Sequence, residues 1–284
     1  MAQVKAIDIW VNPFTPEFMK RLLAWDEVGE VVRWWHMEER YKGHSPEEFA
    51  DILDKAGVEK VFIPSLKMWS FKHKRMGVEY SVKEIHELVN KRPDKFAGLY
   101  GINPYTRMQG VRELESAVKD YGFIGAHLHT YGFGLPVNHR DYYPFYAKCV
   151  ELGVPVVMQI GHSAEAMPSE MGRPIHVDDF ALYFPELNIV ATHTGWPWTE
   201  ELIALAWKHP NVYIGTSAHA PRYWDKSLVN FANTRGKGKV LWGTDYAVVA
   251  HEEGITQIEQ LGLKEDAKAQ LLREAAVKIF KLKK

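Results

Sequence analysis

The feature that most constrains the fold of this chain is its regular alternation, from Val4 onward, of short β-branched runs with longer amphipathic segments. The short runs have the composition and length of strands, and the longer segments have the spacing of helices. The predicted strands are residues 4–11, 58–63, 96–102, 124–129, 155–160, 188–191, 212–215 and 240–243. The predicted helices are residues 46–56, 82–91, 108–120, 143–152, 177–184, 199–208, 226–234 and 265–280.

Local signals mark the ends of several of these helices. Ser45 and Pro46, with Glu48 behind them, form the start of a helix, and Gly57 and Gly153 stand where a helix ends before a strand. About eight strand–helix units close a (β/α)₈ barrel, an α/β fold. The runner-up, an open doubly wound sheet, requires a Gly-rich phosphate loop after an early strand, and the sequence has none. We therefore predict a TIM barrel forming a single domain over residues 1–284.

Composition limits the class of protein. A chain of 284 residues with 46% hydrophobic and 25% charged residues is typical of a globular protein, and no apolar run approaches the roughly 18 residues of a membrane span. The N-terminus lacks the pattern of a signal peptide, so we expect a cytoplasmic protein. A net charge of −1 favours neither nucleic acid nor an anionic membrane as a partner.

Residues 25–44 interrupt the pattern after the first strand. The segment "WDEVGEVVRWWHMEERYKGH" is longer than the usual connection of about two to six residues. Trp34 and Trp35 make it rich in aromatic surface, which fits either a lid over a pocket or a contact between subunits. We expect one of these roles, and a homodimer is the partner state that the second role implies.

The first predicted strand carries a polar or indole side chain at every second position, in "AIDIWVN". Because a strand has a period of two, Asp8, Trp10 and Asn12 are expected to emerge on one face. In a barrel, the C-terminal end of the strand, where these side chains lie, is at the mouth.

Ionisable side chains follow the ends of the later strands. These residues are His127 and His129 after the fourth strand, His162 after the fifth, His193 after the sixth, His219 beyond the seventh and Asp245 after the eighth. Because the carboxyl ends of the strands ring the axis of a barrel, these side chains are expected to converge on one cavity.

Three stretches resemble the amidohydrolase-2 branch of the amidohydrolase superfamily, which contains hydrolases and aromatic-acid decarboxylases. They are "ATHTGWPWTEELIALAWKHPNVYIGTSAH" followed by "VLWGTDY", the passage "GLPVNHRDYYPFYAKCVELGVPVVMQIGHS", and the tail "LLREAAVKIFKL". The resemblance covers nearly the whole chain. One departure is Ala275, where the family usually has Asn.

The resemblance implies roles at single positions. His193 matches the general acid/base of the family, and Asp245 matches an Asp that binds metal and moves protons. The usual metal ligands of the first strand fall on Trp10 and Asn12, and the ligand of the fifth strand falls on Gln159. Indole and amide groups are poor zinc ligands, so the ordinary metal site of the family cannot form.

Two interpretations follow for the cofactor. In the first, the enzyme needs no cofactor and resembles a lactone-hydrolysing branch of the superfamily that works without metal. In the second, a single divalent ion, zinc or manganese, occupies a displaced site, since three N or O ligands and a water suffice for catalytic zinc. The residues available for that site are His129, His162, His193 and Asp245.

The expected function is that of a hydrolase acting on a C–O, C–N or C–C bond beside a carbonyl of a small cyclic or aromatic acid. Asp245 accepts a proton from water and His193 protonates the leaving atom. Other residues are expected to bind the substrate or line its pocket: Trp10, Asn12, His127, His129, Gln159, His162, Trp196, Ser217, His219 and Arg222, with Lys67 and Arg173 as further carboxylate partners and Trp69 and Trp198 as further walls. The alternatives are a carboxy-lyase and a catalytically idle binding protein.

Overall fold

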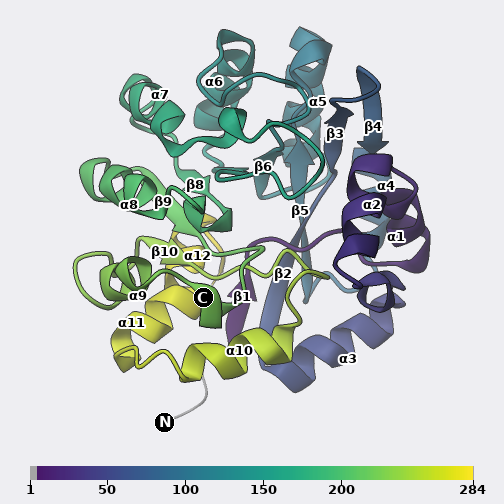
Figure 1. The fold of residues 1–284 in the computed structure, drawn as a ribbon. Helices are drawn as coiled ribbons and strands as arrows, with labels where there is room; N and C mark the ends of the chain where they lie inside the picture. The colour runs from purple at the N-terminus through teal and green to yellow at the C-terminus, as the bar shows by residue number, and fades with distance from the viewer. Residues whose placement is uncertain (1–4, 284) are drawn as a thin grey trace.

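The computed structural model describes residues 5–283 and contains one sheet of eight parallel strands. Figure 1 shows this sheet curled on itself with helices around its outside. The strands follow the order β1-β2-β5-β6-β7-β8-β9-β10, so each pairs with the next barrel strand along the chain. Their bounds are β1 Ala6–Asp8, β2 Val58–Pro64, β5 Phe96–Gly101, β6 Gly125–Leu128, β7 Val156–Met158, β8 Ile189–Ala191, β9 Val212–Gly215 and β10 Val240–Leu241.

Backbone hydrogen bonds join the first strand to the last. The amide of Ile9 donates to the carbonyl of Trp242 (3.1 Å), and the amide of Asp245 donates to the carbonyl of Trp10 (3.0 Å). Val11 and Tyr246 form a further parallel bridge. The ring of strands is therefore closed, and the predicted (β/α)₈ barrel is confirmed.

The helices cover the outer face of the barrel. In Figure 1, α3 from the N-terminal part of the chain lies beside α10 from the C-terminal part. The bounds are α1 Pro16–Leu23, α2 Asp26–Trp34, α3 Pro46–Ala56, α4 Val82–Val89, α5 Arg107–Lys119, α6 Tyr143–Leu152, α7 Val177–Tyr183, α8 Thr199–Lys208, α9 Lys226–Asn233, α10 His251–Glu259, α11 Glu265–Ala269 and α12 Ala275–Ile279, with a π-helical turn at Gln270–Glu274 between the last two.

Local signals explain why the helix bounds were predictable. The Ser45 side chain accepts from the backbone N–H of Glu48, the Glu48 side chain accepts from Ser45, and Gly57 ends α3 in the left-handed conformation. These contacts satisfy backbone groups that a helix end leaves free. The predicted bounds of α3, α6 and α8 are confirmed to the residue.

The structure departs from the predicted elements in three connections: the one after β1 holds α1 and α2, the one after β2 holds a hairpin, and the one after β10 holds α10. Residues 67–79, expected to be a loop, form an antiparallel hairpin of β3 (Lys67–Ser70) and β4 (Arg75–Glu79). The segment 25–44 contains α2 and a 3₁₀ turn, Glu38–Tyr41. The first strand is shorter than predicted, and its expected start at Val4 lies outside the described residues.

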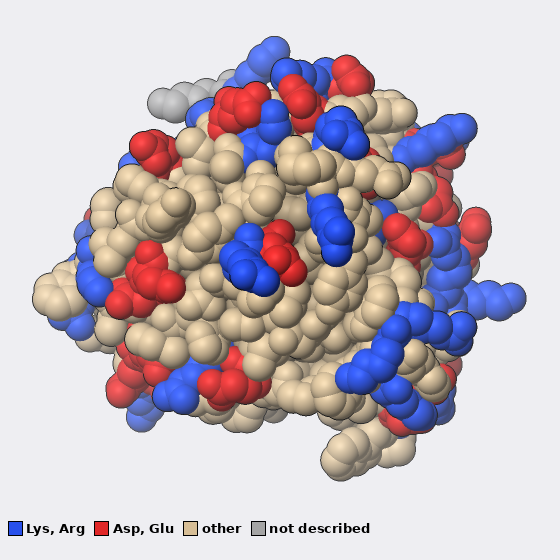
Figure 2. Space-filling model, turned by 90° about the horizontal axis from the view of Figure 1, so that it is seen from above, with Lys and Arg blue, Asp and Glu red and all other residues tan. Residues whose placement is uncertain are grey.

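The surface mixes charges of both signs. Figure 2, seen from the top of Figure 1, shows Lys and Arg interspersed with Asp and Glu over a largely uncharged face. Within residues 5–283, none of the helices has the length and apolar character needed to cross a membrane.

Candidate active site

The first strand and its extension turn three side chains toward the end of β10, as the period of two predicts. Asp8 accepts hydrogen bonds from the backbone N–H of Thr244 (3.1 Å), the Thr244 hydroxyl (2.5 Å) and His251 Nε2 (3.0 Å). Asp8 is completely buried and holds the strand end in place, whereas Trp10 and Asn12 reach Asp245.

Asp245 is held in an unusual conformation by two donors. Trp10 Nε1 donates to Asp245 Oδ1 at 2.6 Å and Asn12 Nδ2 donates to the same oxygen at 2.7 Å. The backbone of Asp245 lies in the left-handed region with φ 53°, which is uncommon for any residue except glycine. Burial raises the pKa of Asp245 to about 7, because the two donors offset only part of the desolvation and the Glu165 charge adds to it.

His193 is a neutral imidazole fixed by a serine. Its backbone is also left-handed, with φ 57°, and its Nδ1 lies 3.0 Å from the Ser217 hydroxyl. Burial, reinforced by the nearby His219, lowers the pKa of His193 to about 3. The imidazolium form is therefore scarcely populated at neutral pH.

A partly buried acidic residue that the sequence did not single out lies in the same place. Glu165, in the loop after β7, has Oε1 at 3.4 Å from His129 Nε2 and accepts a hydrogen bond from the Ser163 hydroxyl at 2.6 Å. Burial raises the pKa of Glu165, but His129 and Ser163 outweigh it and hold the pKa at about 2. The position of Glu165 three residues after His162 was the available signal.

Asp245, His193 and Glu165 line one cavity of about 330 Å³, which we call the inner cavity. Apolar side chains from α2 and the residues after it form part of its wall, which is where the lid predicted for 25–44 would lie. The lining residues are Asn12, Leu22, Val28, Val31, Val32, Trp35, Met37, Met68, Tyr131, Gln159, His162, Ala164, Glu165, His193, Ala218, His219, Asp245 and Val248.

Four of the predicted substrate-binding residues are buried behind this cavity instead of lining it. Trp10 and Ser217 hold Asp245 and His193, and His129 faces Glu165. The ring of His127 packs against Trp10 with centroids 3.8 Å apart, and neither of its nitrogens has a hydrogen-bond partner among residues 5–283. Burial lowers the pKa of His127 well below its usual range.

The remaining predicted residues fall in two places. His162 and His219 line the inner cavity, and the half-exposed Trp196 packs on both rings, with centroids 4.7 and 5.8 Å away. Arg222 instead lines a second hollow of about 390 Å³, the outer pocket. The inner cavity and the outer pocket are both lined by Trp35, Met37, Ala218, His219 and Val248.

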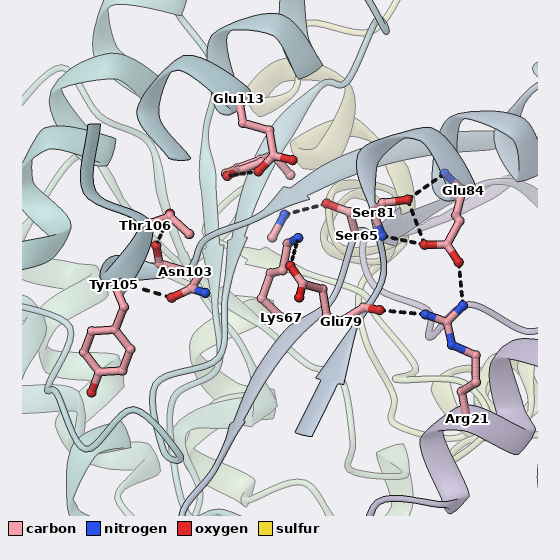
Figure 3. A network of polar contacts seen from close by, with 12 residues as sticks. Arg21, Ser65, Lys67, Glu79, Ser81, Glu84, Asn103, Tyr105, Thr106 and Glu113 are labelled. Carbon is pink, nitrogen blue, oxygen red and sulfur yellow. Dashed lines mark hydrogen bonds and ion pairs between the residues drawn. The ribbon is translucent and has the colours of Figure 1, made fainter. Parts of the chain in front are cut away.

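Four residues proposed from the sequence as carboxylate partners or walls lie outside the inner cavity, and one of them, Trp198, lies beneath the Arg173 guanidinium, 5.8 Å from its ring centroid. Lys67 Nζ donates to Glu79 at 2.7 Å across the β3–β4 hairpin, as Figure 3 shows. Arg173 pairs with Glu201 at 3.5 Å. Trp69 packs on Tyr105, with ring centroids 4.8 Å apart. The hairpin that places Lys67 and Trp69 was not predicted.

The donor set of the inner cavity does not fit a metal ion. Both groups on Asp245 Oδ1 are N–H donors, whose positive ends repel a cation at that oxygen. Asn12 Nδ2 also donates to the carbonyl of Tyr246 (2.9 Å), which fixes the amide with its nitrogen toward Asp245. In the part of the chain that the structure describes, three or more His, Cys, Asp or Glu side chains nowhere gather as a ligand set.

Known proteins of similar fold include enzymes that act on aromatic acids. An uncharacterized TIM-barrel protein from Bordetella bronchiseptica superposes with a TM-score of 0.80 at 23% identity over 98% of each chain. 5-Carboxyvanillate decarboxylase from Sphingomonas paucimobilis superposes with a TM-score of 0.71 at 16% identity, over 99% of this chain and 100% of that one. A dihydroxybenzoic acid decarboxylase from Polaromonas sp., with bound manganese, has a TM-score of 0.72 at 18% identity over 99% of this chain and 98% of that one. At these identities the likeness shows the fold alone.

Two matches at the level of sequence say more about this chain than its likeness in fold does. A 2-keto-4-carboxy-3-hexenedioate hydratase from Sphingobium sp. is 31% identical over an alignment of 130 residues, and the match covers 39% of this chain and 38% of that protein. Residues 80–282, from α4 to the last helix, match the amidohydrolase family Amidohydro_2. The chain therefore belongs to the amidohydrolase family.

Proposed function

We propose that this protein hydrolyses a C–O, C–N or C–C bond beside the carbonyl of a small cyclic or aromatic acid, with lactones and activated esters as the first candidates, and that it does so without a metal. The observation that carries the proposal is Asp245, whose pKa of about 7 suits a group that both accepts and returns a proton near neutral pH. Asp245 shares the inner cavity with the neutral His193.

In this mechanism Asp245 takes a proton from a water molecule as its oxygen attacks the carbonyl carbon. The electron pair of the C=O bond moves to the carbonyl oxygen. When the Ser217 hydroxyl donates to His193 Nδ1, the imidazole proton lies on Nε2 and is donated to that oxyanion, with the Gln159 amide as a second donor. The tetrahedral intermediate then collapses, the bond to the leaving atom breaks, and Asp245 returns its proton to that atom.

The charges of the inner cavity favour hydrolysis over decarboxylation. A carboxy-lyase must bring the carboxylate of its substrate to the reacting centre, where Asp245 and Glu165 already lie. Among the described residues, no Lys or Arg lines this cavity. An anion buried there without a partner is strongly disfavoured.

Hydration of a carbon–carbon double bond is the second candidate. The 31% identical relative is a hydratase, and hydration requires the same activated water. Asp245 would then transfer the proton of water to carbon instead of to a leaving atom.

The proposal that the reaction needs no metal ion is tested by elemental analysis of protein purified without added metal or chelator. We expect metal well below one ion per chain and turnover that survives a chelator. One zinc or manganese per chain, with activity lost on chelation, would overturn this part and return His129, His162 and Asp245 to the role of ligands.

The reaction is tested on a panel of lactones, aryl esters, unsaturated keto acids and hydroxybenzoates in H₂¹⁸O. Hydrolysis or hydration places one ¹⁸O in the organic product, whereas decarboxylation of a hydroxybenzoate yields CO₂ and a phenol that carries no ¹⁸O. Asp245→Asn is expected to lower kcat by about 10²–10⁴, and Asp266→Asn, an exposed carboxylate elsewhere, leaves it unchanged. No turnover on any member would favour the idle binding protein.

A further inference from the structure

The outer pocket carries the positive charge that the inner cavity lacks. Arg222 Nη1 donates to Glu253 Oε1 at 2.9 Å, and Arg40 Nη2 lies 3.4 Å from Glu253 Oε2. Two guanidinium groups thus share one carboxylate, which leaves one net positive charge. Their side chains are 45% (Arg40) and 52% (Arg222) exposed, so both retain donors that solvent or a ligand can reach.

The two guanidinium groups are held in place before any ligand arrives. Arg40 Nη1 donates to the carbonyl of Val248 at 3.0 Å, and the guanidinium of Arg222 lies over the ring of Tyr223 at 4.8 Å. Gln257 Nε2 donates to Glu253 Oε1 at 3.0 Å and fixes the shared carboxylate. Side chains ordered in this way lose less entropy when they bind.

We propose that the outer pocket binds a carboxylate of the substrate while the reacting carbonyl lies beside Asp245 in the inner cavity. The substrate class is therefore a small compound with a carbonyl at one end and a carboxylate at the other. This inference rests on the proposed function, which supplies the position of the carbonyl.

The orientation of the substrate follows from the charges of the two hollows. In the inner cavity a carboxylate meets the carboxyl groups of Glu165 and Asp245, whereas in the outer pocket it meets Arg40 and Arg222. Charge-assisted hydrogen bonds from guanidinium to carboxylate are among the strong ones in proteins. Because Trp35 and His219 line both hollows, the hollows adjoin, and a small ligand can extend from one into the other.

The experiment uses a ligand pair whose ketone carbonyl, the group expected beside Asp245, has no leaving group. Calorimetric titration compares 4-acetylbenzoate, a ketone with a carboxylate, with its neutral analogue 4-acetylbenzamide. We expect the wild type to bind the carboxylate about tenfold more tightly than the amide, and Arg40→Gln and Arg222→Gln each to remove most of that difference while binding of the amide stays unchanged.

Lys42→Gln is the matched control, because it removes the same charge from the same segment outside both hollows and is expected to change neither affinity. Equal affinity of the wild type for both ligands, no binding of 4-acetylbenzoate, or an equal loss in Lys42→Gln would overturn the proposal. Binding of the ketone requires no turnover. If no compound of the reaction panel is turned over but the wild type still prefers the carboxylate ligand, only the proposed function fails and the carboxylate site stands.

Discussion

At the residue scale, the two residues to which we assign proton transfer and oxyanion binding both have left-handed backbones. Asp245 and His193 are not glycines, and such a conformation costs of order 1–3 kcal/mol and persists only where the surroundings impose it. The hydrogen bond from the Asp245 amide to Trp10 and the contact of His193 with Ser217 impose it here. In this backbone conformation both side chains point into the inner cavity.

Asp245→Asn is expected to stabilise the folded protein at alkaline pH. A carboxyl whose pKa rises from 3.8 in the unfolded chain to about 7 in the folded one makes stability fall as pH rises through that window. Removing the charge should raise the free energy of unfolding at pH 8 by up to about 4 kcal/mol. Urea denaturation at pH 8 and pH 5 measures this, and a gain that does not shrink at pH 5 would contradict it.

Glu165→Gln is expected to lower the pKa of Asp245. Burial is the main cause of the raised pKa, and the charge of Glu165 adds to it. If ionised Asp245 is the base, the acid limb of the kcat/KM profile moves to lower pH in this variant. Ser163→Ala removes a hydrogen bond from Glu165 but keeps its charge, so its limb should stay in place. If the acid limb of the kcat/KM profile stays at the same pH in both variants, the charge of Glu165 does not raise the pKa of Asp245.

At the element scale, α2 and the residues after it form one wall of the inner cavity. Val28, Val31, Val32 and Trp35 turn toward the cavity, whereas Trp34 is 80% exposed. The lid role expected of 25–44 remains a prediction, and the side of the segment that lines the cavity is the one it would use. The dimer contact stays a prediction, and Trp34 is the side chain available for it.

Adjacent tryptophans provide a matched pair of variants. Trp35→Ala removes a wall common to both hollows and is expected to raise KM about tenfold through lost apolar contact, with little change in kcat. Trp34→Ala should leave both constants unchanged. Equal effects of the two variants on KM would argue against the lid, and a change of sedimentation in Trp34→Ala would support the dimer.

At the scale of the whole molecule, Asp8 joins the first strand to the last strand and the helix after it. It accepts from Thr244 and from His251 Nε2, and both Asp8 and His251 are buried. Breaking a buried pair of this kind leaves a polar group without a partner, which is strongly destabilising.

Asp8→Asn should therefore lower the free energy of unfolding by about 3 kcal/mol. A double-mutant cycle with His251→Gln measures the coupling between the two side chains by urea denaturation. The exposed pair of Asp266 and Lys237 is the control, and Asp266→Asn should leave stability nearly unchanged. Similar stability of the Asp8 and Asp266 variants would mean that Asp8 does not hold the barrel closed.

Local patterns were sufficient for the barrel itself. Strand and helix periodicity, the cap at Ser45 and the glycine after α3 depend on neighbours a few residues away, so they can be read along the chain. The same holds for the shared face of Asp8, Trp10 and Asn12, and for Asp245 and His193 at strand ends. The β3–β4 hairpin and helices α1, α2 and α10 were missed, because these excursions do not belong to the alternation that predicts the barrel.

Only the tertiary structure decided how the site is charged. The pKa of Asp245 and that of His193 depend on desolvation by residues from many strands, and the role of Glu165 depends on a loop that returns to His129. Trp10 occupies a position where the family has a metal ligand, but that its indole N–H points at Asp245 is a matter of packing. Sequence alone therefore determined that Asp245 and His193 stand at strand ends of a barrel, while the fold determined which other residues join them, their protonation and their contacts, because these depend on burial and distance between segments far apart in the chain.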